Sequence, residues 1–343
     1  MARAVDDREA RLRRARWGFG VLGLLLLIAF VAALAGITRD VYSPQGVVQG
    51  YLQALANHDL RSVSEIDGVP APEEFPEDQR TILLSEAALG RIDDIRIVES
   101  LEIEPGLVQV TAAYRLAPAG AESPGYEYQR SFLMERGERA WFFFDRWGFA
   151  EPPIETVQIQ IKHDRRFTAN GQAVQGLGVA AGAVTPYLVY GPGIYRIDYQ
   201  DEYLRADPED LVVTGDGGTV IITLRPTDAF VERVQQEVNA YLDSCAEQRV
   251  LQPTGCPFGH FVSDRIISEP QWTITRYPDV TIKSDREGFY VPRSTVEARL
   301  RVQVQALYDG SISTLDVNEG GSTGFRLTIQ PDGSVTIRFA NVD

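Results

Sequence analysis

Hydrophobic and polar positions change their spacing several times along this chain of 343 residues. Residues 17–37 carry no charged side chain, and at about 1.5 Å per residue they are long enough to cross a hydrocarbon core of about 30 Å. After Ser43 and Pro44, apolar residues recur at helical spacing and predict a helix that begins at Pro44 with Ser43 as its cap. A second helical stretch is expected from about Glu77 to Leu89.

From Asp93 onward, apolar positions alternate with polar ones, which predicts strands. The strands before the first proline-rich joint are expected at residues 95–103, 108–114, 126–134 and 140–147. Two helices that lead into a long antiparallel sheet indicate an α+β arrangement for this part of the chain.

Past Glu151–Pro153, short alternating runs and tight turns such as Gly215–Gly218 predict a small β-sandwich. Thr227 then caps a second amphipathic helix, whose apolar face includes Cys245, and antiparallel strands follow it. The expected fold class is therefore α+β: an N-terminal transmembrane helix, an α+β cone-like domain, a small β-sandwich and a C-terminal helix-plus-antiparallel-sheet domain. The expected boundaries are 1–42 for the Arg-rich tail and transmembrane helix, 43–152 for the cone, 153–226 for the sandwich and 227–343 for the last domain.

The stretch GVVQGYLQALANHDL, the strands after it and the closing WFFFDRWGFAEPP resemble the cystatin-like cone, the fold of nuclear transport factor two. The resemblance covers residues 43–152 and implies a curved sheet around a helix, with a pocket that some members use for catalysis or for ligands. It places Tyr51, Tyr114, Trp141 and Phe143 near that cavity. Aromatic residues on a helix or strand face are more often core than ligand contacts, so both interpretations of these four residues stay open.

Residues 155–226 resemble PEGA-type surface domains in the order of an Asn-Gly turn, a Thr-Pro strand and a Pro-Gly-x-Tyr strand, without the family's Pro-Glu-Gly-Ala turn. The resemblance implies a role in envelope binding or spacing and carries no catalytic residue across. An anchor followed by cone and sandwich domains is similar to the TcaA-type surface proteins. This chain lacks their zinc ribbon, so their function is not carried across.

Charge around the apolar segment predicts its orientation. Six arginines precede residue 17, and only Arg39 and Asp40 follow closely, so the N-terminus is expected in the cytoplasm and the bulk of the chain outside it. The small-x-small triplet ending at Ala35 also fits a cleaved signal peptide, although signal cores run to about 7–15 residues. Both alternatives export the same domains. The expected location is the bacterial cytoplasmic membrane, spanned once through residues 17–37.

Composition narrows the partners. The formal net charge is −15, which excludes nucleic acid as the expected partner because phosphates need clustered basic residues. The two cysteines, Cys245 and Cys256, are exported and expected to form a disulfide worth about 3 kcal/mol. His260 is the nearest histidine, and a metal site needs more ligands than this.

Two motif matches fail on their context. Gly320–Gly324 fits the G-x-S-x-G nucleophile elbow, but no histidine follows it and a strand comes next, so a flexible glycine loop is expected. Gly176–Ala181 fits a loose dinucleotide fingerprint, but Pro186 and a strand follow where a helix is required. No catalytic residue, cofactor or metal site is predicted.

The sequence thus predicts a non-catalytic module of the bacterial cell envelope that binds or spaces an envelope protein or a cell-wall component. Two alternatives remain. A receptor for a small molecule or lipid would use the cone cavity, and an enzyme would place a carboxylate-based site in that same cavity. An open sheet with side chains filling the cone would favour the first hypothesis over both.

Overall fold

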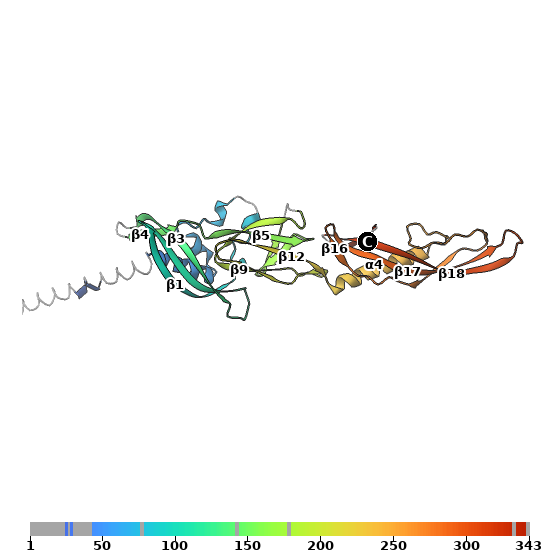
Figure 1. The fold of residues 1–343 in the computed structure, drawn as a ribbon, viewed down its shortest axis with the longest axis horizontal. Coiled ribbons are helices and arrows are strands. Elements are labelled where there is room, and N and C mark those ends of the chain that lie inside the picture. Colours follow the sequence, from blue (N-terminus) through green and yellow to red (C-terminus); the bar gives the residue numbers. More distant parts are fainter. Residues whose placement is uncertain are drawn as a thin grey trace, which may run out of the picture.

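The protein is described from a computed structural model (Figure 1). The structure describes residues 25, 26, 28, 29 and 43–340, except 76–78, 141–143, 177–179 and 331–333. Three units follow one another in chain order and together form an elongated rod (Figure 1).

The predicted α+β class is wrong, because strands make up 49% of the structure and helices only 17%. The helix expected at 77–89 is replaced by short 3₁₀ turns. Its apolar residues serve two separate cores, since Leu83 and Ala88 pack into one and Leu84 and Leu89 into the other. Among the described residues, no helix is both apolar and long enough to cross a membrane. Most of segment 17–37 lies outside the described residues.

The first unit packs one helix against one antiparallel sheet. Helix α2 (Pro44–Ala56) begins as predicted, with the Ser43 hydroxyl accepting a hydrogen bond from the Gly46 N–H at 3.0 Å. Its apolar face covers a sheet in the order β1-β2-β3-β4. The other elements are α3 (Leu60–Ser64), η1 (Pro72–Glu74), η2 (Gln79–Thr81), η3 (Glu86–Ala88), β1 (Arg91–Glu104), β2 (Leu107–Ala117), β3 (Tyr126–Ala140) and β4 (Phe144–Phe149).

The second unit is built from small sheets that enclose a common core. One sheet has the order β12-β5-β8, with β12 parallel to β5, and the other has the order β11-β9-β6-β7. A short β10-β13 pair leads to the third unit. The strands are β5 (Ile154–Lys162), β6 (Arg166–Ala169), β7 (Gln172–Gln175), β8 (Val184–Tyr190), β9 (Gly193–Asp198), β10 (Leu204–Arg205), β11 (Glu209–Val213), β12 (Gly218–Thr223) and β13 (Arg225–Pro226).

The third unit packs helix α4 (Asp228–Ala246) on a sheet centred on two long strands. Thr227 caps this helix as predicted, since its hydroxyl accepts a hydrogen bond from the Phe230 N–H at 3.2 Å. The long hairpin of β17 and β18 reaches the far end of the rod (Figure 1). The strands are β14 (Arg265–Ile266), β15 (Gln271–Arg276), β16 (Lys283–Asp285), β17 (Gly288–Gln305), β18 (Ile312–Ile329) and β19 (Val335–Ala340).

The prediction of a flexible loop at Gly320–Gly324 is wrong, because these residues lie inside β18. A Cβ at Gly321 would lie 1.8 Å from the carbonyl oxygen of Pro257, so glycine lets the loop after the disulfide cross the strand closely. The strand continues past Ser322, and a nucleophile elbow would need a turn into a helix there.

Candidate functional site

The two described residues of the predicted cone cavity are core residues. Tyr51 on α2 and Tyr114 on β2 are fully buried. The Tyr51 ring meets Phe149 edge-on at 5.0 Å and Phe132 at 6.2 Å between centroids. Side chains therefore fill the space around Tyr51 between helix and sheet. Trp141 and Phe143, the other two predicted cavity residues, lie outside the described residues.

The hydroxyl of Tyr51 crosses from the first unit to the second. It donates to the carbonyl oxygen of Gly191 at 2.8 Å and also lies 3.2 Å from the carbonyl oxygen of Pro153. Burial raises the pKa of Tyr51 well above its ordinary value, so the phenol stays protonated and remains a donor. A residue predicted for a cavity thus joins two units.

A buried ion pair lies at the same boundary. Arg130 Nη1 on β3 is 2.5 Å from Glu155 Oε1 on β5, and the two side chains are only 13% and 7% exposed. The other carboxylate oxygen of Glu155 accepts hydrogen bonds from the N–H groups of Gly215 at 3.2 Å and Gly217 at 2.9 Å. Both oxygens of the carboxylate are therefore engaged, which is what a buried charge requires.

The first joint, defined here as Tyr51, Arg130, Glu155 and Gly191, leaves no room for a ligand at its centre. A Cβ at Gly191 would lie 2.2 Å from Glu155 Oε1 and 2.4 Å from Arg130 Nη1. Glycine at this position lets the backbone approach the ion pair closely. A general base must reach its substrate, whereas Glu155 is buried and both of its carboxylate oxygens already accept hydrogen bonds from the protein. The arrangement holds two units together.

A further contact beside the first joint comes from the turn between β6 and β7. The Asn170 amide donates to the carbonyl oxygen of Ala88 in the first unit and to that of Ile194 in the second, both at 2.8 Å. Its carbonyl oxygen accepts from the Arg196 N–H at 3.0 Å. One side chain thus ties backbone from both units, so the boundary is closed on this side as well.

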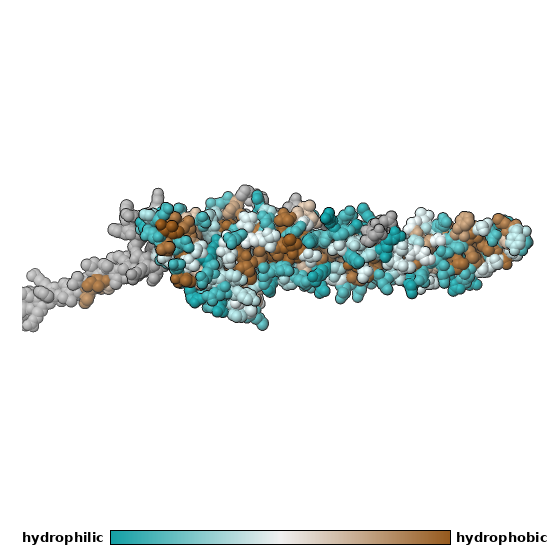
Figure 2. Space-filling model, in the orientation of Figure 1, coloured by the Kyte–Doolittle hydropathy of each residue, from teal (hydrophilic) through white to brown (hydrophobic). Residues whose placement is uncertain are grey.

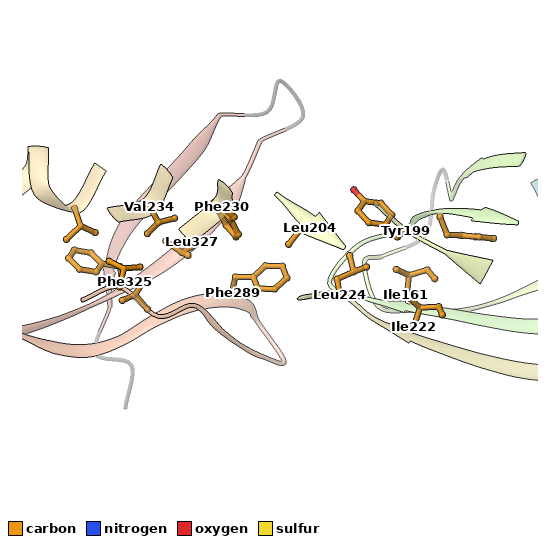
Figure 3. Packing of buried hydrophobic residues seen from close by; sticks show 14 of the residues in the cluster. Ile161, Tyr199, Leu204, Ile222, Leu224, Phe230, Val234, Phe289, Phe325 and Leu327 are labelled. Atoms are coloured by element: carbon orange, nitrogen blue, oxygen red, sulfur yellow. The ribbon is translucent and has the colours of Figure 1, made fainter. Parts of the chain in front are cut away.

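The second joint, defined here as Tyr203, Thr227, Phe230 and Phe289, is mainly apolar. The Phe230 ring lies 5.5 Å from Tyr203 and 6.0 Å from Phe289 between centroids. The Thr227 N–H donates to the Tyr203 carbonyl oxygen at 2.9 Å. Figure 3 shows Leu204 between the two sets of side chains, so one hydrophobic cluster runs from the second unit into the third.

One histidine contacts the second joint. The His163 ring lies 5.3 Å from Phe289. Burial lowers the pKa of His163, Lys162 acts in the same direction, and Asp285 opposes them. Neutral imidazole is therefore the form that suits this contact.

Two further candidates are too small or too sparse to bind a ligand. A hollow of about 10 Å³ in the second unit, beside Ile161, Asp164 and Tyr187, has room for about one water. No group of three or more His, Cys, Asp or Glu side chains in the described part of the chain could hold a metal ion. Cys245 and Cys256 are joined, with 2.09 Å between their sulfur atoms.

Sequence analysis did not identify Arg130 and Glu155 as a buried pair, although the position of each residue in its strand pattern indicates burial. Glu155 lies in phase with Val157, Ile159 and Ile161, the buried residues of its strand. Arg130 shares the phase of Phe132 and Met134 on β3 in the same way. A charged residue in the apolar phase of a strand must find a buried partner.

Comparison of this chain with family models, with curated proteins and with solved structures finds no match.

Proposed function

We propose that this protein is a stiff spacer of the bacterial cell envelope, held at the cytoplasmic membrane through residues 17–37 and extending outward from it. The observation that carries the proposal is that both joints between the three units are closed by buried contacts. Loosely linked domains move relative to one another by default unless their interface is tight. Here Tyr51, Arg130 and Glu155 fix one boundary, and Phe230 with Phe289 fixes the other.

The location rests on the sequence. Arginines before residue 17 and an uncharged stretch up to residue 37 are typical of a segment that stays in the membrane with its N-terminus inside. The Cys245–Cys256 disulfide fits an oxidising compartment. Cleavage after Ala35 would release the same three units, and an intact N-terminus on the mature protein would argue against it.

The packing around the predicted cavity supports spacing over a receptor or an enzyme. Both alternatives need open space in the first unit, where Tyr51 and Tyr114 are fully buried. An enzyme also needs an accessible carboxylate, and Glu155 is enclosed by three hydrogen-bond partners.

The experiment is negative-stain electron microscopy of the full chain in lipid nanodiscs. Straight rods of one length that project from the disc are the expected result. A wide range of bend angles between units, or chains folded back on the disc, would contradict a spacer. Thiol labelling of Arg249→Cys in intact spheroplasts checks the location, since the variant residue should react without lysis.

A further inference from the structure

Strand β1 exposes three large apolar side chains in its second half. Val98, Leu101 and Ile103 are 56%, 58% and 49% exposed. The register with β2 shifts at Val98 and again at Ile103, so each of these two is the extra residue of a β-bulge and has no residue opposite it on β2. Single exposed apolar residues are ordinary on a protein surface, but three of them within residues 98–103 indicate an interaction surface.

These three residues, called here the base patch, lie toward the end of the first unit that faces away from the second. Strand β1 begins beside the second unit, since a Cβ at Gly90 would lie 2.6 Å from the carbonyl oxygen of Ile194. At about 3.3 Å per residue, the base patch lies about 20–40 Å farther along the strand. Figure 1 shows this end of the first unit at the left of the rod, and Figure 2 shows hydrophobic side chains on it.

The chain enters the first unit close to the base patch. Gln45, on the first turn of α2, donates from its Nε2 to Ser100 Oγ at 2.8 Å, directly beside Leu101. Ile37 ends the apolar segment and is six residues before Ser43. An extended chain covers at most about 3.6 Å per residue, so a membrane-spanning segment 17–37 holds Ser43 within about 22 Å of the hydrocarbon edge. The lipid headgroups are therefore the surface nearest to the base patch.

Charges beside the base patch indicate which lipid it fits. Glu99 and Glu104 are exposed on the same strand, and Glu102 Oε1 accepts a hydrogen bond from the Gly106 N–H at 3.2 Å. Anionic headgroups repel carboxylates, whereas the ammonium groups of zwitterionic headgroups attract them. Apolar side chains beside carboxylates are therefore suited to a zwitterionic lipid surface.

We propose that the base patch rests on the outer surface of the membrane, with its three side chains in the headgroup layer of zwitterionic lipid. Burial of apolar surface stabilises such a contact. The contact gives the rod a second attachment beside residues 17–37 and limits its tilt against the membrane. This inference rests on the proposed function, because it requires residues 17–37 to span the membrane.

The test uses the full chain in phosphatidylcholine nanodiscs that contain lipid with a spin label near the headgroup. Both native cysteines are in the disulfide, so Leu101→Cys can be labelled selectively with the fluorophore bimane. The matched control is Tyr126→Cys, which replaces a 75% exposed residue at the other end of the same sheet. The spin-labelled lipid should quench bimane at position 101 at least about twofold more strongly than at position 126, because interfacial side chains enter the headgroup layer.

Failure of the membrane location and failure of the lipid contact give different results. A chain that does not copurify with the nanodiscs would contradict the location and the contact together. A chain that copurifies, but shows equal quenching at positions 101 and 126 or none at position 101, would overturn the contact alone. Partial replacement of the lipid by phosphatidylglycerol should lower the quenching at position 101, and unchanged or stronger quenching would overturn the assignment to zwitterionic lipid.

A second variant tests the effect of the contact on the tilt of the rod. Leu101→Ser, Ile103→Ser removes side chains that are already exposed, so the fold should persist by circular dichroism. In electron micrographs its rods should meet the disc over a wider range of angles than those of the unchanged chain, at the same rod length. Tyr126→Ser, Val184→Ser removes two exposed apolar side chains elsewhere and should leave that range unchanged. Equal ranges for the two variants would overturn the proposal.

Discussion

The two joints of the rod close similar boundaries with different chemistry. The first uses directional contacts, namely a buried ion pair and the Tyr51 hydroxyl on two carbonyl groups. The second uses aromatic rings around Phe230, with few hydrogen bonds beside them. Directional contacts are lost when two units rotate by a small angle, whereas ring packing tolerates such shifts. The first joint therefore sets the angle between units, and the second mainly supplies apolar burial.

The largest effect is expected at the ion pair. Glu155→Ala leaves Arg130 buried without its partner and should destabilise the first two units by about 3–5 kcal/mol in denaturant unfolding. Arg249→Ala, which removes one side of the exposed pair with Glu269, serves as the control and should cost less than about 1 kcal/mol. Equal losses in the free energy of unfolding for the two variants would show that burial of the Arg130–Glu155 pair does not increase its contribution to stability.

The second joint should respond to the loss of a ring. Phe230→Ala removes a fully buried side chain and should cost about 3–4 kcal/mol, chiefly in the unfolding of the third unit. Differential scanning calorimetry separates the units when their coupling is lost. A single unshifted transition would contradict an apolar joint.

The disulfide should act on the third unit alone. Reduction of Cys245–Cys256 should destabilise that unit by about 2–3 kcal/mol, because the bond closes a short loop at the end of α4. Calorimetry with and without reductant measures this. An equal shift in the melting transition of the first unit would contradict this, because it would mean that the loss of stability in the third unit reaches the first unit through both joints.

A single hydroxyl tests the directional character of the first joint. Tyr51→Phe keeps the ring and loses the hydrogen bond to Gly191, so about 1–2 kcal/mol of stability should be lost. Tyr114→Phe is the matched control, because the buried Tyr114 hydroxyl has no hydrogen-bond partner among the described residues. Removal of the Tyr114 hydroxyl should leave the free energy of unfolding unchanged or increase it. A larger loss of stability in Tyr114→Phe than in Tyr51→Phe would contradict these hydrogen-bond assignments.

The smallest effect is a pH dependence at the second joint. Because the folded state holds the pKa of His163 below its ordinary value near 6.5, the unfolded chain binds the proton more readily. This part of the stability is complete above about pH 6.5 and declines as the pH falls below it. The melting temperature should therefore fall between pH 7.5 and 5.5 by slightly more in the unchanged chain than in His163→Gln. An identical fall in melting temperature in the two proteins would show that His163 does not contribute to the pH dependence of stability.

Local structure was predictable where one pattern determines it. Ser43 and Thr227 cap the two long helices as expected, and the sulfur atoms of Cys245 and Cys256 lie at bonding distance. Capping depends on neighbours three residues away, and two exported cysteines leave few alternatives.

Longer-range features escaped prediction because they depend on two units at once. The stretch 77–89 divides its apolar residues between two cores, which no helical pattern shows. Tyr51 was expected near a cavity, and its hydroxyl instead binds carbonyl groups that are 102 and 140 residues away in sequence. From the sequence, Gly321 was predicted to lie in a flexible loop. The close approach of the Pro257 backbone, which explains the glycine, is visible only in the folded structure.

The most direct test of the rod is the distance between spin labels across each joint. Both native cysteines are in the disulfide, so cysteine pairs at exposed sites can be labelled selectively: Arg96 with Asp207 across the first joint and Asp207 with Arg249 across the second. Pulsed electron resonance on the full chain should give a single distance for each pair, narrower across the first joint than across the second, and Glu155→Ala should broaden only the first. Broad or multiple distances in the unchanged chain would contradict a rigid spacer.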